Sequence, residues 1–233
     1  MAVESTGYCG EPTARQSQVL PGWSVEQAKR MGASMVKLLV YYHPEARTSA
    51  GVEAFVSQVA ADCQKYDLAL MLEPLAYSPQ GNGKLSSGEK RSIVVETARR
   101  LTPLGIDVLK AEFPLDSSVD QDEGTWKQAC AEISSASCVP WILLSATVDY
   151  EIYQRQMEAA CRAGASGIAV GRAVWQEAVG ADSRERTSFL MKVARPRLEH
   201  LSARCTELGR PWTDFYRAGE IAPDWYKTYG EQT

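Results

Sequence analysis

The chain has 233 residues, a formal net charge of −4 and 45% hydrophobic residues. This length allows one large domain or two small ones with a sizeable core. The acidic balance argues against a nucleic-acid-binding protein, which needs a basic surface, but it still allows an anionic small substrate. No stretch approaches the roughly 18 consecutive apolar residues of a membrane span, and the N-terminus lacks the pattern of a signal peptide. We therefore expect a cytoplasmic protein with no membrane or nucleic-acid partner.

Short apolar runs alternate with amphipathic stretches along the chain. Strands are predicted at 34–42, 68–76, 106–114, 140–146 and 166–171, and helices at 24–31, 51–66, 86–101, 122–136 and 149–163. The strands are nearly continuous apolar runs, typical of parallel strands that are covered on both faces. Their regular alternation with helices predicts right-handed crossovers and a parallel α/β fold. Because no Gly-rich GxGxxG turn follows a strand, a (β/α)8 barrel is favoured over a dinucleotide-binding fold.

The number of predicted strands is too small for a complete barrel of eight strands. Five full strands and a fragment at Met1–Glu4 are visible. We therefore expect a single domain over 1–233 that lacks strands at its N-terminal side, with an open sheet and bare edges.

The C-terminal part is predicted to be one helix at 183–208, kinked or interrupted by Pro196, followed by an aromatic tail at 209–233. The aromatic side chains of the tail are Trp212, Phe215, Tyr216, Trp225, Tyr226 and Tyr229. A tail of this kind fits a strap across the barrel and a dimer contact equally well, so a homo-oligomer stays possible. The six cysteines are scattered without a CxxC pair, which indicates reduced thiols and neither a disulfide framework nor a zinc site.

Lys110 is the most informative residue. It lies in the middle of a predicted buried strand, where an unpaired ammonium is costly. A desolvated, neutral lysine can attack a ketone to form a Schiff base. Alternation along the strand places Glu112 on the same face, so a purely structural Lys110–Glu112 ion pair is the competing interpretation.

Lys110 is one of six candidate site residues near the carboxyl ends of the predicted strands, where barrels carry their functional groups. The six are Lys37, Glu73, Lys110, Ser145, Gly171 and Arg172. Tyr41 and Tyr42 must face opposite sides of their strand, so at most one of them can line such a site. Trp141 and Trp175 are expected to pack in the core or against helices. The convergence of charged groups from different strands favours a functional site, since solvated charges more often lie on helix faces.

Several of these segments resemble the class I tagatose-1,6-bisphosphate aldolases, a family that includes sulfofructose-phosphate aldolases. The matching segments are ESTGY (4–8), LPGWSVEQAKRMGASMVKLLVYYHP (20–44), LMLEPLAY (70–77), DVLKAEFP (107–114), PWILLSA (140–146) and GASGIAVGRAVWQ (164–176). VKLLVYY, VLKAEFP and GRAVWQ are specific only in combination.

The resemblance implies a (β/α)8 barrel that needs no metal or other cofactor and acts on a phosphorylated sugar. It implies that Lys110 is the Schiff-base lysine and that Lys37 and Glu73 are active-site residues. It also implies that Ser145, Gly171 and Arg172 help to hold a phosphate. The implied activity is cleavage of a ketose such as tagatose 1,6-bisphosphate to dihydroxyacetone phosphate and a three-carbon aldehyde.

The sequence departs from the family at its N-terminus. Members carry two further strand–helix units before the segment that matches Glu4–Tyr8, and the first of those strands ends in an Asp-Gln-Arg stretch. Two alternatives therefore stay open. The chain could be an inactive aldolase-like fragment that serves as a binding or regulatory protein. It could also be another barrel enzyme for phosphorylated substrates, such as an isomerase, in which Lys110 acts only through its charge.

Overall fold

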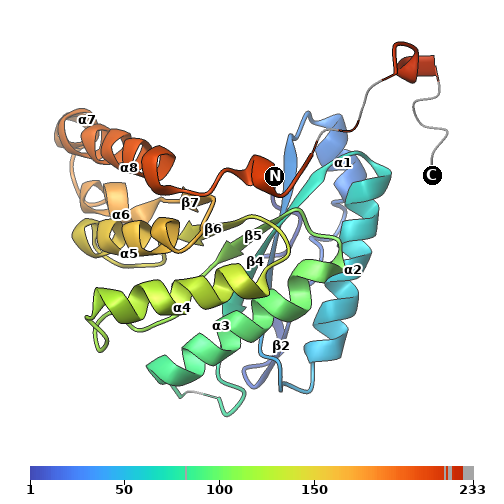
Figure 1. The fold of residues 1–233 in the computed structure, drawn as a ribbon, viewed down its shortest axis with the longest axis horizontal. Helices are drawn as coiled ribbons and strands as arrows, with labels where there is room; N and C mark the ends of the chain where they lie inside the picture. Colours follow the sequence, from blue (N-terminus) through green and yellow to red (C-terminus); the bar gives the residue numbers. More distant parts are fainter. Residues whose placement is uncertain (82, 218, 220–221, 228–233) are drawn as a thin grey trace.

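A parallel sheet of five strands forms the centre of the computed structural model, which describes residues 1–81, 83–217, 219 and 222–227 (Figure 1). The strands are β3 (Met35–Tyr42), β4 (Ala69–Ala76), β5 (Val108–Ala111), β6 (Trp141–Leu144) and β7 (Gly167–Ala169). Each strand pairs in parallel with the next along the chain. All five lie within the predicted ranges, so the prediction of a parallel α/β sheet is confirmed.

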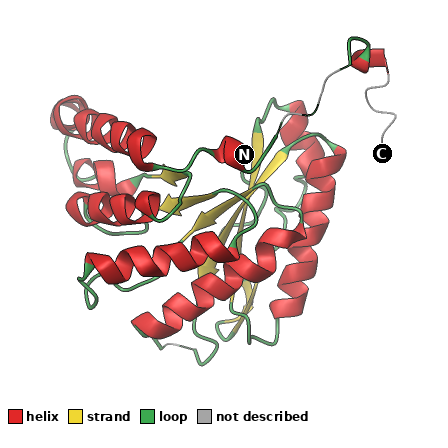
Figure 2. Cartoon of the chain, in the orientation of Figure 1, coloured by secondary structure: helices red, strands yellow, loops and turns green. Residues whose placement is uncertain are grey.

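Helices connect the strands and cover the outer face of the sheet (Figure 2). They are α1 (Val25–Arg30), α2 (Ser49–Lys65), α3 (Ser87–Leu101), α4 (Glu123–Ala136), α5 (Tyr150–Arg162), α6 (Arg172–Trp175), α7 (Ser183–Phe189) and α8 (Arg195–Leu208). The start of α3 illustrates how the sequence sets these boundaries. The Ser86 side chain accepts a hydrogen bond from the Glu89 N–H, and the Glu89 side chain accepts one from the Ser86 N–H. This reciprocal capping box fixes the first turn of the helix.

The N-terminal segment adds a short parallel strand beside β3. Ala2 pairs with Lys37, and Val3 and Lys37 donate hydrogen bonds to the carbonyl groups of Lys37 and Met1, respectively. The other side of the segment is covered by residues 18–20, which hydrogen-bond to Val3 and Ser5. The expectation of a bare N-terminal edge is therefore wrong. Between this segment and β7, the described residues form no backbone pairing, so the sheet is part of a barrel and stays open.

The two faces of the sheet have different environments. Alternate residues on the outer face are fully buried against α2 to α5, including Val36, Leu38, Leu70, Leu72 and Leu109. The residues between them, such as Leu39, Met71 and Lys110, lie on the inner face and are only partly buried. The prediction that both faces are covered is thus wrong for the inner face, because the open sheet leaves it accessible.

Trp126 anchors α4 in the core. Its side chain is fully buried, its indole N–H donates to the Asp120 carbonyl over 2.7 Å, and its ring meets Phe113 edge-on at 5.2 Å. We expect Trp126→Ala to lower the free energy of unfolding by about 3–5 kcal/mol. Val119→Ala, at a position that is 73% exposed, should change it by less than about 0.5 kcal/mol. Urea denaturation of the two variants checks this, and a Trp126 effect as small as that of the control would contradict it.

The C-terminal helix is interrupted, as predicted, close to Pro196. α7 runs into a π-helical turn at Leu190–Ala194, and Pro196, which has no N–H to donate to the preceding turn, follows at the start of α8. Beyond α8, the Tyr216 hydroxyl donates to the Asp107 carbonyl over 2.6 Å and ties the first part of the tail to the start of β5. This contact favours the interpretation of the tail as a strap across the barrel over that of a dimer contact. Tyr229 lies outside the described residues.

Candidate functional site

Four charged side chains form a continuous ionic chain on the inner face of the sheet. The Lys110 ammonium lies 3.1 Å from a Glu73 oxygen, and the Lys37 ammonium lies 3.2 Å from the same oxygen. Lys37 also contacts Glu4 at 2.5 Å. The order Glu4–Lys37–Glu73–Lys110 alternates in sign, so each buried charge has an opposite neighbour. The predicted convergence of Lys37, Glu73 and Lys110 is therefore present in the structure.

Strand register explains this geometry. Leu72 of β4 pairs with Leu109 of β5, so Glu73 and Lys110 follow at the same level and point to the inner face. Lys37 is the third residue of the eight-residue strand β3, which corrects the expectation that it lies at a strand end. It reaches Glu73 from one level below, since Leu39 is the residue of β3 that pairs with Glu73.

Glu4 is the site residue that our reasoning from the sequence missed. It lies in the N-terminal strand segment, and the matching stretch ESTGY was noticed without a role for its first residue. Its Oε1 contacts Lys37, whereas its Oε2 is buried without a hydrogen-bond partner among the described residues. A buried acceptor that lacks a partner is costly, and a substrate hydroxyl could satisfy it.

Burial and ion pairing act against each other at Lys37. Burial lowers the pKa of the Lys37 ammonium, but the hydrogen bond to Glu4 and the charges of Glu73 and Glu4 outweigh burial, and the net effect raises the pKa. Lys37 is therefore a fixed positive charge beside Glu73. It is suited to stabilising anions in the site and not to acting as a nucleophile.

Glu112 does not pair with Lys110, which corrects the ion pair considered from the sequence. The Glu112 Oε2 instead accepts a hydrogen bond from the Ala76 N–H over 2.7 Å. Burial raises the pKa of Glu112, against the opposing charge of Lys90 and the hydrogen bond from Ala76. The nearby charge of Glu73 acts in the same direction as burial, so Glu112 binds a proton more readily than an exposed glutamate does.

A pocket of about 610 Å³ opens next to Lys110 at the carboxyl ends of β4 to β7. Glu73, Lys110, Ser145, Gly171 and Arg172 all line it. The Gly171 N–H donates to the Ser145 hydroxyl over 3.3 Å, which joins the ends of β6 and β7. Five of the six predicted site residues thus share one pocket, and the sixth, Lys37, contacts it through Glu73.

Two other features mark the rim of this pocket. Ala146, directly after Ser145, has a φ of 43°, a left-handed conformation that is strained for alanine. Trp175 is 41% exposed and lines the pocket, so of the two predicted locations, the core or against helices, the core is excluded. Trp141 is fully buried, as predicted.

Of the two neighbouring tyrosines, Tyr42 faces α2 and hydrogen-bonds Glu53, so Tyr41 is the tyrosine of this pair on the inner face.

A second hollow of about 440 Å³ adjoins the first and shares Glu112, Leu144, Ala146 and Thr147 with it. Its cationic lining residues are Arg15, Lys84 and Lys90. Neither lysine lies within salt-bridge distance of a carboxylate in the described part of the chain. The Arg15 guanidinium is held over the rings of Tyr8, Tyr41 and Tyr77, at 4.6, 5.2 and 4.8 Å. Asp116 and Glu112 also line the hollow, so it carries both cationic and carboxyl groups.

Among the described residues, no group of three or more His, Cys, Asp or Glu side chains is placed to hold a metal ion. In the same part of the chain, no helix has the length and hydrophobicity that crossing a membrane requires.

Comparison with known proteins agrees with this geometry. Residues 1–177 match the model of the DeoC/LacD family aldolases. Tagatose 1,6-diphosphate aldolase 2 of Streptococcus mutans is 28% identical over 94% of this chain and 73% of its own length. Tagatose 1,6-diphosphate aldolase of Staphylococcus aureus is 30% identical over 77% of this chain and 60% of its own length.

Solved structures of aldolases are also similar to this chain. The crystal structure of an archaeal fructose 1,6-bisphosphate aldolase is 27% identical, with a TM-score of 0.57 over 83% of this chain and 70% of its own. An archaeal fructose-1,6-bisphosphate aldolase with its catalytic lysine bound to a carbinolamine intermediate is 26% identical, with a TM-score of 0.59 over 86% and 70% of the two chains. The match to the family model covers most of the sequence and includes the strands that carry the ionic chain and the pocket beside it. The chain belongs to the DeoC/LacD family of aldolases.

Proposed function

We propose that the protein is a Schiff-base aldolase that cleaves a phosphorylated ketose, such as tagatose 1,6-bisphosphate, into dihydroxyacetone phosphate and a three-carbon aldehyde. The main support is the position of Lys110. Its ammonium lies 3.1 Å from a carboxylate, on the wall of a pocket whose far rim carries an arginine. A nucleophilic amine, a base within hydrogen-bonding distance and an anion-binding group are what this reaction needs.

The first step is condensation of Lys110 with the substrate ketone. Lys110 must lose a proton before it can attack, and Glu73 is the carboxylate positioned to accept it. The amine then attacks C2, a proton moves from the attacking nitrogen to the carbonyl oxygen to give a carbinolamine, and its hydroxyl group leaves as water to give an iminium ion. Glu73 can return its proton to the departing hydroxyl group, so that one carboxyl group serves both proton transfers.

The second step is cleavage of the C3–C4 bond. The C4 hydroxyl gives its proton to Glu73, directly or through water, and the electron pair of the C3–C4 bond moves into the iminium to form an enamine. The aldehyde leaves, C3 of the enamine is protonated, and hydrolysis frees Lys110 and dihydroxyacetone phosphate. The Lys37 ammonium, 3.2 Å from Glu73, holds that carboxylate in position, and the free Glu4 oxygen can accept a hydrogen bond from a substrate hydroxyl.

The rim formed by Ser145, Gly171 and Arg172 is suited to the phosphate on C1. The Ser145 hydroxyl and backbone N–H groups can donate to phosphate oxygens, and an arginine fork matches them in geometry.

Arg172→Ala tests this assignment. We expect KM for the phosphorylated ketose to rise about tenfold or more, because a charge-assisted hydrogen bond contributes about 1.5–3 kcal/mol, while kcat changes less. Steady-state kinetics measure both constants. Arg184→Ala, at an exposed position of α7, is the matched control. An unchanged KM in the Arg172 variant would remove this residue from the phosphate site.

Lys84 and Lys90 of the hollow beside the pocket are suited to a second anionic group at the other end of the substrate. In the double variant Lys84→Ala/Lys90→Ala we expect KM for a ketose 1,6-bisphosphate to rise at least about tenfold, and KM for the matching 1-monophosphate to stay unchanged. Lys192→Ala, on an exposed turn, serves as the control. An equal rise for both substrates would show that the lysines act on something other than the distal phosphate.

Borohydride reduction of the protein in the presence of dihydroxyacetone phosphate, followed by peptide mass mapping, tests the proposal as a whole. The expected result is a stable adduct on Lys110. A well-folded sample that gives no adduct would instead favour an inactive relative, or an enzyme in which Lys110 acts only through its charge.

A further inference from the structure

Two cysteines from different helices meet on the outer side of the last strand. Cys161 of α5 and Cys205 of α8 are 44 positions apart, and their sulfur atoms are 3.9 Å apart. The neighbouring ion pair between Arg204 and Glu158, at 3.2 Å, joins the same two helices. Both cysteines are free thiols in this structure. None of the catalytic steps described above uses either of them.

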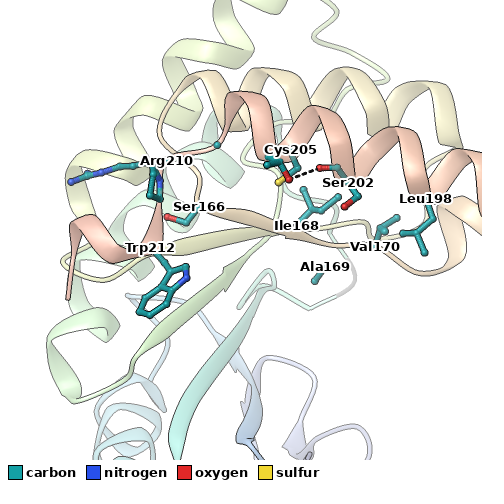
Figure 3. A pocket seen from close by; sticks show the side chains of 12 residues that line it. Ser166, Ile168, Ala169, Val170, Leu198, Ser202, Cys205, Arg210 and Trp212 are labelled. Carbon is teal, nitrogen blue, oxygen red and sulfur yellow. Dashed lines mark hydrogen bonds between the residues drawn. The ribbon is translucent and has the colours of Figure 1, made fainter. Parts of the chain in front are cut away.

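The two thiols have unequal surroundings. Cys161 is 2% exposed, whereas Cys205 is half-buried and lines a hollow of about 630 Å³ together with Ile168, Leu198 and Trp212 (Figure 3). Small solutes can therefore reach Cys205 but not Cys161. The Cys161 thiol donates a hydrogen bond to the Cys205 sulfur. This bond lowers the pKa of Cys205 to about 7, although burial opposes the shift, and it raises the pKa of Cys161.

We propose that Cys161 and Cys205 are a peroxide-reactive thiol pair that closes reversibly into a disulfide between α5 and α8. The Cys205 thiolate attacks one oxygen of hydrogen peroxide, the O–O bond breaks, and hydroxide leaves and is protonated to water. The product is a sulfenic acid on Cys205. The Cys161 sulfur then attacks the Cys205 sulfur, the S–O bond breaks, and a second water leaves. In total, two thiols are oxidised and one peroxide is reduced to two waters.

The local structure allows the second attack. A disulfide needs the sulfurs to move about 2 Å closer than they are. Cys205 lies near the end of α8, and the backbone leaves the helix at Gly209, whose N–H bonds the Cys205 carbonyl. This end of a helix can shift more easily than its middle. Cys161 also lies near the end of its helix, one residue before the last residue of α5.

The other cysteines lack this combination of access and partner. Cys9 is half-buried, but its thiol donates to the Gln16 carbonyl over 3.5 Å and contacts no other cysteine in the described part of the chain. Burial raises the pKa of Cys63 and of Cys130 to about 12, and both side chains are buried. Cys138 is exposed, but its sulfur contacts the Thr102 hydroxyl and no other cysteine. Cys138 is therefore a matched control, because it is the more accessible thiol and lacks a sulfur neighbour.

The disulfide would join α8 to the helix layer beside β7. α8 packs against both α5 and β7, and β7 leads directly to Gly171 and Arg172 of the proposed phosphate rim. In the reduced protein, α8 is held by packing and by ion pairs at the surface. A covalent bond to α5 would slow the local opening of α8.

The test is treatment of the full chain with a small excess of hydrogen peroxide, followed by proteolysis without reductant and mass spectrometry. The expected product is one cross-linked peptide that joins Cys161 to Cys205, and dithiothreitol should remove it. Cys138→Ser should give the same product. Cys205→Ser should give no cross-link, and Cys161→Ser should accumulate a sulfenic acid on Cys205 that dimedone traps. Hydrogen exchange in 195–208 should slow at least several-fold on oxidation in the wild type but not in Cys205→Ser.

Several results would overturn the proposal. They are the absence of the Cys161–Cys205 peptide in the wild type, its loss in Cys138→Ser, or preferential oxidation of Cys138. Because Cys161 is buried, Cys161→Ser could fold poorly. In that case the Cys205→Ser variant is used, because Cys205 is only half-buried. Dimedone labelling that persists in Cys205→Ser at the wild-type level would show that the reactive thiol is another cysteine.

Discussion

Lys110→Arg is expected to abolish both cleavage and borohydride trapping. Arginine keeps the positive charge beside Glu73 and should leave the fold intact, but it cannot lose its proton to become a nucleophile. We expect kcat/KM to fall by about ten-thousand-fold or more, as is typical when the residue that forms the covalent intermediate is removed. Cleavage is measured with a coupled assay for dihydroxyacetone phosphate, and trapping by the mass of the intact protein.

Lys127→Arg is the control, since Lys127 is exposed on α4 and away from the pocket. It should keep full activity. The experiment separates a covalent mechanism from a purely electrostatic role of Lys110. If Lys110→Arg retained more than about a tenth of the activity, a Schiff base on this residue could not be the route, because only the charge is preserved.

Glu73→Gln is expected to lower kcat by about a hundred- to ten-thousand-fold with little change in KM. The amide keeps the size of the side chain but cannot accept a proton from Lys110 or from the C4 hydroxyl. It also removes the negative charge that lies between Lys37 and Lys110 at 3.2 and 3.1 Å, so that two ammonium groups face each other. Steady-state kinetics and the rate of borohydride trapping report on cleavage and on imine formation, respectively.

Glu199→Gln is a suitable control, because Glu199 pairs with Arg195 on the exposed side of α8. A rise in KM without a fall in kcat for Glu73→Gln would contradict a proton-transfer role. Glu73 would then serve only to hold the two lysines in place. Normal trapping with slow cleavage would assign Glu73 to the C4 hydroxyl step alone.

The strands and helices of this protein could be predicted because each is encoded locally. The apolar runs that contain Leu38, Leu72 and Leu109 form strands whose outer face is fully buried. Ser86 and Glu89, three residues apart, form the capping box at the start of α3. Such patterns depend on the residue period of a helix or strand, so they can be recognised in the sequence without knowledge of the fold.

The partners of Lys110 could not be predicted in the same way. Alternation along the strand suggested Glu112, which shares the strand with Lys110, whereas the structure pairs Lys110 with Glu73 from the neighbouring strand. A salt bridge across strands depends on register, and register is fixed by the packing of many side chains at once. The contribution of Glu4 was missed for the same reason, since Glu4 and Lys37 are 33 positions apart and are brought together by the parallel pairing at Ala2.

The sequence by itself determined the order of elements, the family and the lysine at the centre of the pocket, because these are properties of short segments read one at a time. Tertiary structure decided which carboxylate neutralises which lysine, that Glu4 presents a free oxygen, and that Trp175 is exposed at the rim. It also brought Cys161 and Cys205 to 3.9 Å across two helices. Each of these depends on contacts between segments far apart in the chain, and such contacts form only when the sheet and its helices pack together.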